Sequence, residues 1–149
     1  MTTLALWLHV VAAAAWLGGN LIMLMIPGLM AQGGPPAMLA TGRTALVLGR
    51  VFFTPAAIIT LLTGIWLVID IDAYAFSEPF VSLGFAAVLI IMIGSFTVLI
   101  PNGRKMIAAM EAGDGATAQA LAPRQSTMSV INSLVLLVTI YGMVARWGA

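Results

Sequence analysis

The chain contains no cysteine, a single histidine and few charged residues. Among its 149 residues are six lysines and arginines and five acidic residues, so 7% are charged and the formal net charge is +1. The lack of cysteine excludes disulfides, iron–sulfur clusters and thiolate metal sites. The few basic residues do not form the clustered positive face that nucleic-acid binding requires. We therefore expect no nucleic-acid partner.

The motifs of common hydrolases are also missing. The sequence holds no H-E-x-x-H, no G-x-S-x-G and no phosphate-binding glycine loop. Three polar residues of the last apolar segment, Ser129, Asn132 and Ser133, have no acid or second base at membrane depth to activate a nucleophile. We expect them to form hydrogen bonds between helices.

Apolar residues are abundant: 62% of the chain is hydrophobic, arranged in runs of a length that suits a hydrocarbon core about 30 Å thick. Breaks occur at Pro27-Gly28, in the Gly- and Pro-rich stretch 31–42, and at Pro101-Asn102-Gly103. Pro55 lies inside the second run, where we expect a kink relieved by the hydroxyl of Thr54 or Thr60. A short amphipathic helix is also expected before Gly113.

These breaks predict the fold class and the domain organisation. The fold is all-α, an integral membrane four-helix bundle that forms one domain over residues 1–149, with helices at 3–26, 44–69, 79–100 and 125–147 and a cytoplasmic loop over 102–124.

Basic residues near the helix ends predict the orientation, because Lys and Arg are retained on the cytoplasmic side. One side holds Arg43, Arg50, Arg104, Lys105 and Arg124; the other holds Arg146 and the acidic residues Asp70, Asp72 and Glu78. Both termini are therefore expected on the extracytoplasmic side. An aromatic belt is expected there too, formed by Trp7, Trp66, Tyr74 and Trp147.

His9 is the main candidate for a functional residue, since an ionisable side chain at membrane depth usually serves a function. Helical spacing places Trp16 on its face, together with the small residues Ala12, Ala13 and Gly19. Small residues allow another helix to pack closely, which predicts a homodimer through this face. They also leave room for a flat ring beside the histidine, and we expect Trp16 to contact such a cofactor.

Motif residues in the first two predicted helices resemble those of a known group. They are His9, Ala12, Ala13, Trp16, Leu17 and Gly18, followed by Arg50, Thr54-Pro55 and the run Thr63–Leu67. With this pattern the chain resembles small bacterial membrane proteins of the HemJ-type protoporphyrinogen oxidase and CopD-like copper-resistance group. The resemblance implies a protein of the bacterial inner membrane in which His9 is an axial ligand of b-type haem.

The stretch Phe80–Phe85 lacks the lysine that HemJ-type proteins carry at the start of the third helix. This favours a related haem protein with a redox or electron-transfer role over the oxidase itself; if the chain is an enzyme, we expect an oxidoreductase. Depth along the helices makes Met143 the candidate for a second iron ligand, with Gly64, Gly84 and Gly142 leaving space for the ring. Arg50 either reaches the lipid headgroups or binds a haem propionate or a lipid phosphate.

Two alternatives remain open at this point. Imidazole and thioether ligands also suit copper, which would make the chain a component of a copper transporter. Alternatively, the chain binds no cofactor and is an accessory subunit, in which His9 bonds a neighbouring backbone carbonyl. The expected partners are the lipid bilayer, a second copy of the chain and a membrane redox protein.

Overall fold

The computed structural model describes residues 1–71 and 74–147, so Asp72, one of the acidic residues assigned above to the side opposite the basic cluster, lies outside the described range. Within this range every regular element is a helix, which confirms the all-α prediction. The elements are α1 (Thr2–Met30), the 3₁₀ turn η1 (Ala31–Gly33), α2 (Gly34–Leu48), the π-helical segment η2 (Gly49–Phe53), α3 (Thr54–Asp70), α4 (Pro79–Gly94), a second π-helical segment η3 (Ser95–Leu99), α5 (Ile100–Glu111) and α6 (Gly115–Val144).

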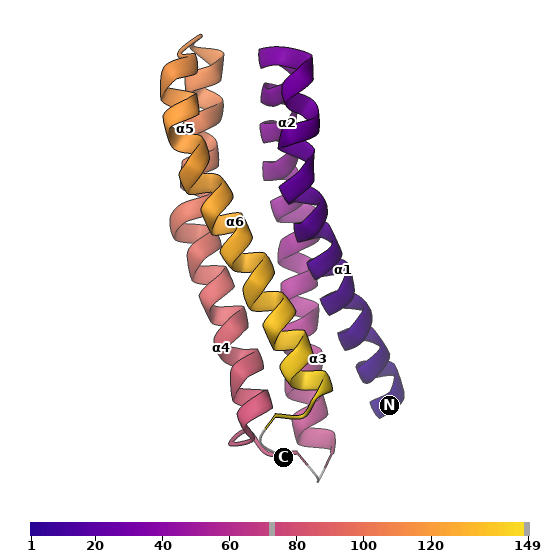
Figure 1. The fold of residues 1–149 in the computed structure, drawn as a ribbon. Coiled ribbons are helices and arrows are strands. Elements are labelled where there is room, and N and C mark those ends of the chain that lie inside the picture. Colours follow the sequence, from indigo (N-terminus) through magenta and orange to yellow (C-terminus); the bar gives the residue numbers. More distant parts are fainter. Residues whose placement is uncertain (72–73, 148–149) are drawn as a thin grey trace.

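The helices run side by side in one elongated bundle (Figure 1). The chain reverses between α1 and α2 and again between α5 and α6, and both reversals lie at the same end. The start of α1 and the end of α6 lie at the opposite end. Three uninterrupted helical stretches, 2–70, 79–111 and 115–144, are long and apolar enough to cross a membrane. The length and apolar composition of these helices are therefore consistent with a membrane protein.

Burial in the last helix supports an apolar environment around the bundle. Asn132, Ser133 and Thr139 of α6 are buried, whereas the exposed face carries large apolar side chains. That exposed face includes Val130, Ile131, Leu134, Leu137, Val138, Tyr141 and Val144. A helix with polar groups inward and apolar groups outward reverses the pattern of a soluble protein and suits a lipid surrounding.

The first helix continues past the break that the sequence predicts at Pro27-Gly28. Pro27 lies inside α1, and its carbonyl accepts a hydrogen bond from the amide of Ala31. The reversal comes instead at Gly34, whose φ of +71° lies in the left-handed region that glycine adopts without strain. Helix α2 then starts at once, because Pro35 and Pro36 occupy its first turn, where a backbone N–H is not needed. The predicted loop over 31–42 is therefore wrong beyond Gly33.

Two other prolines are accommodated by widened helical turns. Proline lacks an N–H and its ring crowds the carbonyl four residues earlier, which is Val51 for Pro55 and Thr97 for Pro101. Both of these residues lie in π-helical segments, η2 and η3. The hydroxyl of Thr54 also donates to the carbonyl of Gly49 at 2.7 Å. Because the wider turns absorb the prolines, Pro101 does not end the helix.

The predicted loop over 102–124 is also wrong. Most of it is helical, in α5 and the first turns of α6, with a connection only at 112–114. Asn102 is buried and its side-chain amide donates to the carbonyl of Leu121 at 3.1 Å and to Oε1 of Gln125 at 3.0 Å. The expected short amphipathic helix corresponds to α5, whose Ile107 and Met110 pack beside Gly42 of α2.

Candidate functional site

His9 lies between α1 and α3 and is half-buried. Its Nδ1 is 2.9 Å from the carbonyl oxygen of Thr60 and 3.1 Å from the hydroxyl oxygen of Thr63. A carbonyl oxygen can only accept a hydrogen bond, so we assign the proton to Nδ1, which donates. In a neutral imidazole this leaves a lone pair on Nε2, which makes no hydrogen bond with the described part of the chain.

The three α3 residues around the histidine share one helix face. Thr60, Thr63 and Gly64 are spaced i, i+3 and i+4, so they follow one another along that face. A Cβ atom added to Gly64 would lie 3.1 Å from Cε1 of His9, closer than most Cβ contacts. Gly64 therefore makes room for the imidazole itself. Thr60 and Thr63 were not among the predicted site residues; their shared helix face was readable in the sequence, but its position opposite His9 was not.

The other two glycines that the sequence assigned to a haem ring also have neighbours from this chain. A Cβ atom at Gly84 would meet the methyl group of Met143, and one at Gly142 would lie 2.7 Å from Cδ2 of Leu83. The space beside each of them is filled by a side chain. Room for a porphyrin therefore cannot be attributed to these glycines in this conformation.

Trp16 lies in the core of the bundle and is only 3% exposed. It packs with Ala56 and Ala57 of α3 and with buried side chains of α4 and α6. This layer lies about two helical turns from His9, at a rise of 1.5 Å per residue. Trp16 therefore stabilises the bundle, and a contact of its ring with a cofactor remains a prediction.

Met143 and Arg50 are not brought to His9 by any contact between the described residues. Met143 is half-buried in α6 and packs over Gly84 of α4, whereas His9 packs against α3. Arg50 is exposed in η2, ten residues before Thr60, a separation of about 15 Å along the helix. The pairing of His9 with Met143 and the anion contact of Arg50 remain predictions.

The small-residue face of α1 is largely used inside the chain. Ala12 is buried, and a Cβ atom on Gly19 would lie 2.7 Å from Phe52 and 2.9 Å from Phe53. A Cβ atom on Gly18, in contrast, would have no heavy atom within 4 Å. A homodimer remains a prediction, and any such contact has to use the side of α1 that bears Gly18.

Ser129 and Ser133 of α6 do not form the hydrogen bonds between helices that the sequence led us to expect. Ser129 donates to the carbonyl of Gln125 and Ser133 to that of Ser129, both at 3.0 Å and both within α6. Asn132 is 2% exposed, and its Oδ1 has no hydrogen-bond partner in the described structure. The hydroxyls are satisfied locally because a helix offers each serine a carbonyl four residues earlier.

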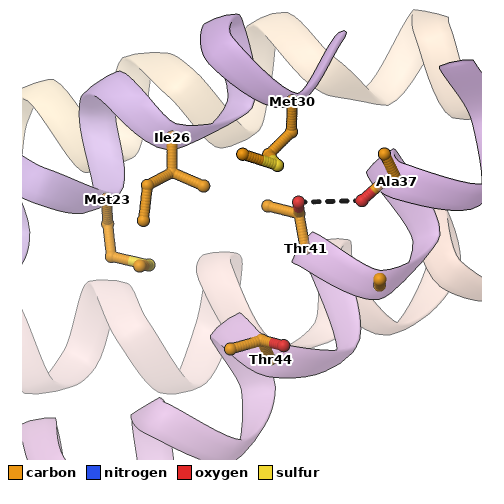
Figure 2. A pocket seen from close by; sticks show the side chains of 7 residues that line it. Met23, Ile26, Met30, Ala37, Thr41 and Thr44 are labelled. Atoms are coloured by element: carbon orange, nitrogen blue, oxygen red, sulfur yellow. Dashed lines mark hydrogen bonds between the residues drawn. The ribbon is translucent and has the colours of Figure 1, made fainter. Parts of the chain in front are cut away.

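An apolar groove of about 370 Å³ lies at the other end of α1 from His9. Figure 2 shows Met23, Ile26 and Met30 of α1 facing Thr41 and Thr44 of α2 across it. The hydroxyl of Thr41 is engaged by the carbonyl of Ala37 at 2.8 Å. With no charged side chain in its lining, the groove offers no obvious site for polar chemistry.

The donor atoms near His9 limit which metals the site suits. Among residues 1–71 and 74–147, no group of three or more His, Cys, Asp or Glu could hold a metal ion. A single imidazole is a poor site for a bare ion, but it suffices for haem, because the porphyrin supplies four nitrogen ligands to the iron itself.

Comparison of the chain with family models, with curated proteins and with solved structures found no match.

Proposed function

We propose that this chain is a four-span protein of the bacterial inner membrane that binds b-type haem through Nε2 of His9 and has a redox or electron-transfer role. The observation that carries the proposal is the hydrogen bond from Nδ1 of His9 to the carbonyl of Thr60. Histidines that ligate metals commonly donate their other N–H to such a carbonyl, which orients the ring and increases its basicity. Bound haem supplies one-electron chemistry at its iron.

Four spans are supported by the geometry of the first helical stretch. Residues 2–70 form a continuous series of helical turns, but the chain reverses direction at Gly34. They therefore provide two antiparallel helical segments. With 79–111 and 115–144, this makes four crossings. The excess of basic residues near the two reversals supports a cytoplasmic location for that end and an extracytoplasmic one for both termini.

Exposed tryptophans support the proposed position of the membrane surface at the extracytoplasmic end of the bundle. Trp7, Trp66 and Trp147 are 59%, 48% and 45% exposed. Such rings are enriched at membrane interfaces. Tyr74 differs from the other members of the predicted belt, because its ring packs edge-on against Phe80 and beneath the guanidinium of Arg146.

The proposal is tested by the visible spectrum of the protein purified from membranes of haem-sufficient cells. We expect a Soret band, its loss in His9→Ala, and its loss also in His9→Gln. Glutamine keeps an N–H that can bond the Thr60 carbonyl but is a poor iron ligand, so a folded yet colourless His9→Gln protein separates ligation from packing. A colourless wild-type protein that also fails to bind added haem contradicts the proposal. Metal analysis of the same samples tests the copper alternative.

A second candidate function is favoured by the same hydrogen bond. The bond joins α1 to α3 and satisfies Nδ1 with protein groups alone, as expected of a histidine with a purely structural role in a cofactor-free accessory subunit. In that case the purified protein is colourless, His9→Ala lowers its thermal stability, and His9→Gln largely preserves it.

A further inference from the structure

We propose that Thr63 is a positioning residue for His9: together with the Thr60 carbonyl, its hydroxyl holds the proton on Nδ1 and so keeps the Nε2 lone pair available to the iron. This inference rests on the proposed function for its second half only, since the protonation of the ring can be measured without haem. The Thr60 carbonyl is a backbone group and cannot be removed by substitution. Thr63 is the one side-chain partner of Nδ1 among the described residues.

The direction of the hydrogen bonds follows from the partners of the Thr63 hydroxyl. Its oxygen lies 2.6 Å from the carbonyl oxygen of Ile59, four residues earlier, and 3.2 Å from that of Thr60. The hydroxyl has one hydrogen, which the short contact assigns to the Ile59 carbonyl. The hydroxyl oxygen is then left to accept from Nδ1 of His9 at 3.1 Å.

The opposite arrangement is unfavourable. If Nδ1 carried a lone pair, that lone pair would face the Thr60 carbonyl oxygen at 2.9 Å, and two acceptors would be opposed without a proton. The Thr63 hydroxyl would also have to leave the Ile59 carbonyl in order to donate to the ring. Both costs favour the tautomer with its proton on Nδ1.

Gly64 fixes which edge of the ring faces the helix. A Cβ atom at Gly64 would lie 3.1 Å from Cε1 and 3.5 Å from Nδ1 of His9, so these two adjacent ring atoms face α3. The Nε2–Cδ2 edge therefore faces away from α3. A ligand of Nε2 approaches from outside the α1–α3 contact, and the threonine and glycine together hold the ring for that approach.

The single histidine makes a direct test practical, because protein labelled with ¹⁵N-histidine gives signals from one imidazole only. In haem-free protein at neutral pH, we expect the ¹⁵N spectrum to show a protonated Nδ1 and an unprotonated Nε2. Thr63→Val is expected to shift the population toward the other tautomer, and Thr63→Ser to retain the wild-type spectrum. In titrations with haem, Thr63→Val is expected to weaken binding about 10-fold, the usual cost of losing an outer partner of a ligating histidine.

Thr97→Val is the matched control. The Thr97 hydroxyl also bonds a carbonyl of its own helix, that of Ile93 at 2.7 Å, and it has no contact with His9. A wild-type spectrum with the proton on Nε2, or a Thr63→Val spectrum identical to the wild type, overturns the inference. A protein that binds no haem but shows the Thr63-dependent Nδ1 tautomer contradicts the proposed function alone.

Discussion

Gly18 and Gly19 are adjacent in α1 but have opposite surroundings. The ring edges of Phe52 and Phe53 come so close to Gly19 that a methyl group there would lie within 3 Å of both, whereas Gly18 faces open space. Successive residues point about 100° apart around a helix, so one glycine faces the bundle and the other faces outward. Only Gly19 is required for the packing of α1 on η2.

We therefore expect Gly19→Ala to destabilise the fold by about 1–3 kcal/mol, the usual cost of overpacking. Gly18→Ala is the matched control; it is expected to be neutral or to stabilise by up to about 1 kcal/mol, because alanine favours the helix. Unfolding in mild detergent measures both. Equal effects of the two substitutions would show that the rings near Gly19 adjust freely.

At the candidate site, the sequence identifies His9 but not its partners. His9 stands out as the one histidine in an apolar run. Thr60 and Thr63 lie 51 and 54 residues further along the chain, so pairing them with His9 requires the register of α1 against α3. That register depends on where the chain reverses, and Pro27 falsely indicates an early reversal. A local pattern cannot supply a contact that depends on distant helix ends.

Among the elements, the interior of each apolar helix was predictable and the ends were not. The apolar runs correctly predict helices, since length and composition determine that property. Proline and glycine signals misplaced the ends at Pro27 and Pro101, because a proline breaks a helix only when its lost hydrogen bond and its crowded carbonyl cannot be accommodated. Wider turns in η3 accommodate Pro101, which a rule based on residue pairs does not anticipate.

The start of α6 depends on one exposed carboxylate. Asp114 accepts a hydrogen bond from the amide of Thr117 at 3.0 Å, as an N-cap does. Hydrogen bonds from Thr117, first from its side chain and then from its backbone, lower the pKa of Asp114 below its ordinary value. The carboxylate form is therefore the one that the folded helix prefers.

Because this pKa is lowered by folding, the cap contributes fully at a pH above the ordinary value, about 4, and is lost as the pH falls through the lowered value. We expect amide exchange in the first turn of α6, corrected for intrinsic rates, to accelerate over that acidic range. Asp114→Ala should show the fast exchange already at neutral pH. Asp114→Asn keeps a capping oxygen without a titrating group, so its protection should not change over the same range; a wild-type turn without pH dependence contradicts this assignment.

For the whole molecule, the absence of native cysteine allows a clean test of topology. We expect Ala112→Cys, between α5 and α6, to react with a membrane-impermeant maleimide only after cells are permeabilised. Ser77→Cys, before α4, should react in intact cells, because the proposed topology puts that connection outside. Both positions are exposed, so solvent access within the fold is not limiting. The reverse labelling pattern inverts the orientation, and labelling of both from outside contradicts four spans.

The contact between α1 and α3 differs in kind from the contact between α4 and α6. His9 bonds α1 to α3, and the Thr2 hydroxyl donates to the carboxylate of Asp70 across the same pair. Between α4 and α6, the described contacts are van der Waals packing without hydrogen bonds. The methyl groups of Met128 and Met143 pack over Gly94 and Gly84. Beyond Gln125, the register of α6 against α4 therefore depends on how closely these side chains fit. Packing over Gly84 therefore sets the position of Met143, whereas hydrogen bonds to α3 set the position of His9.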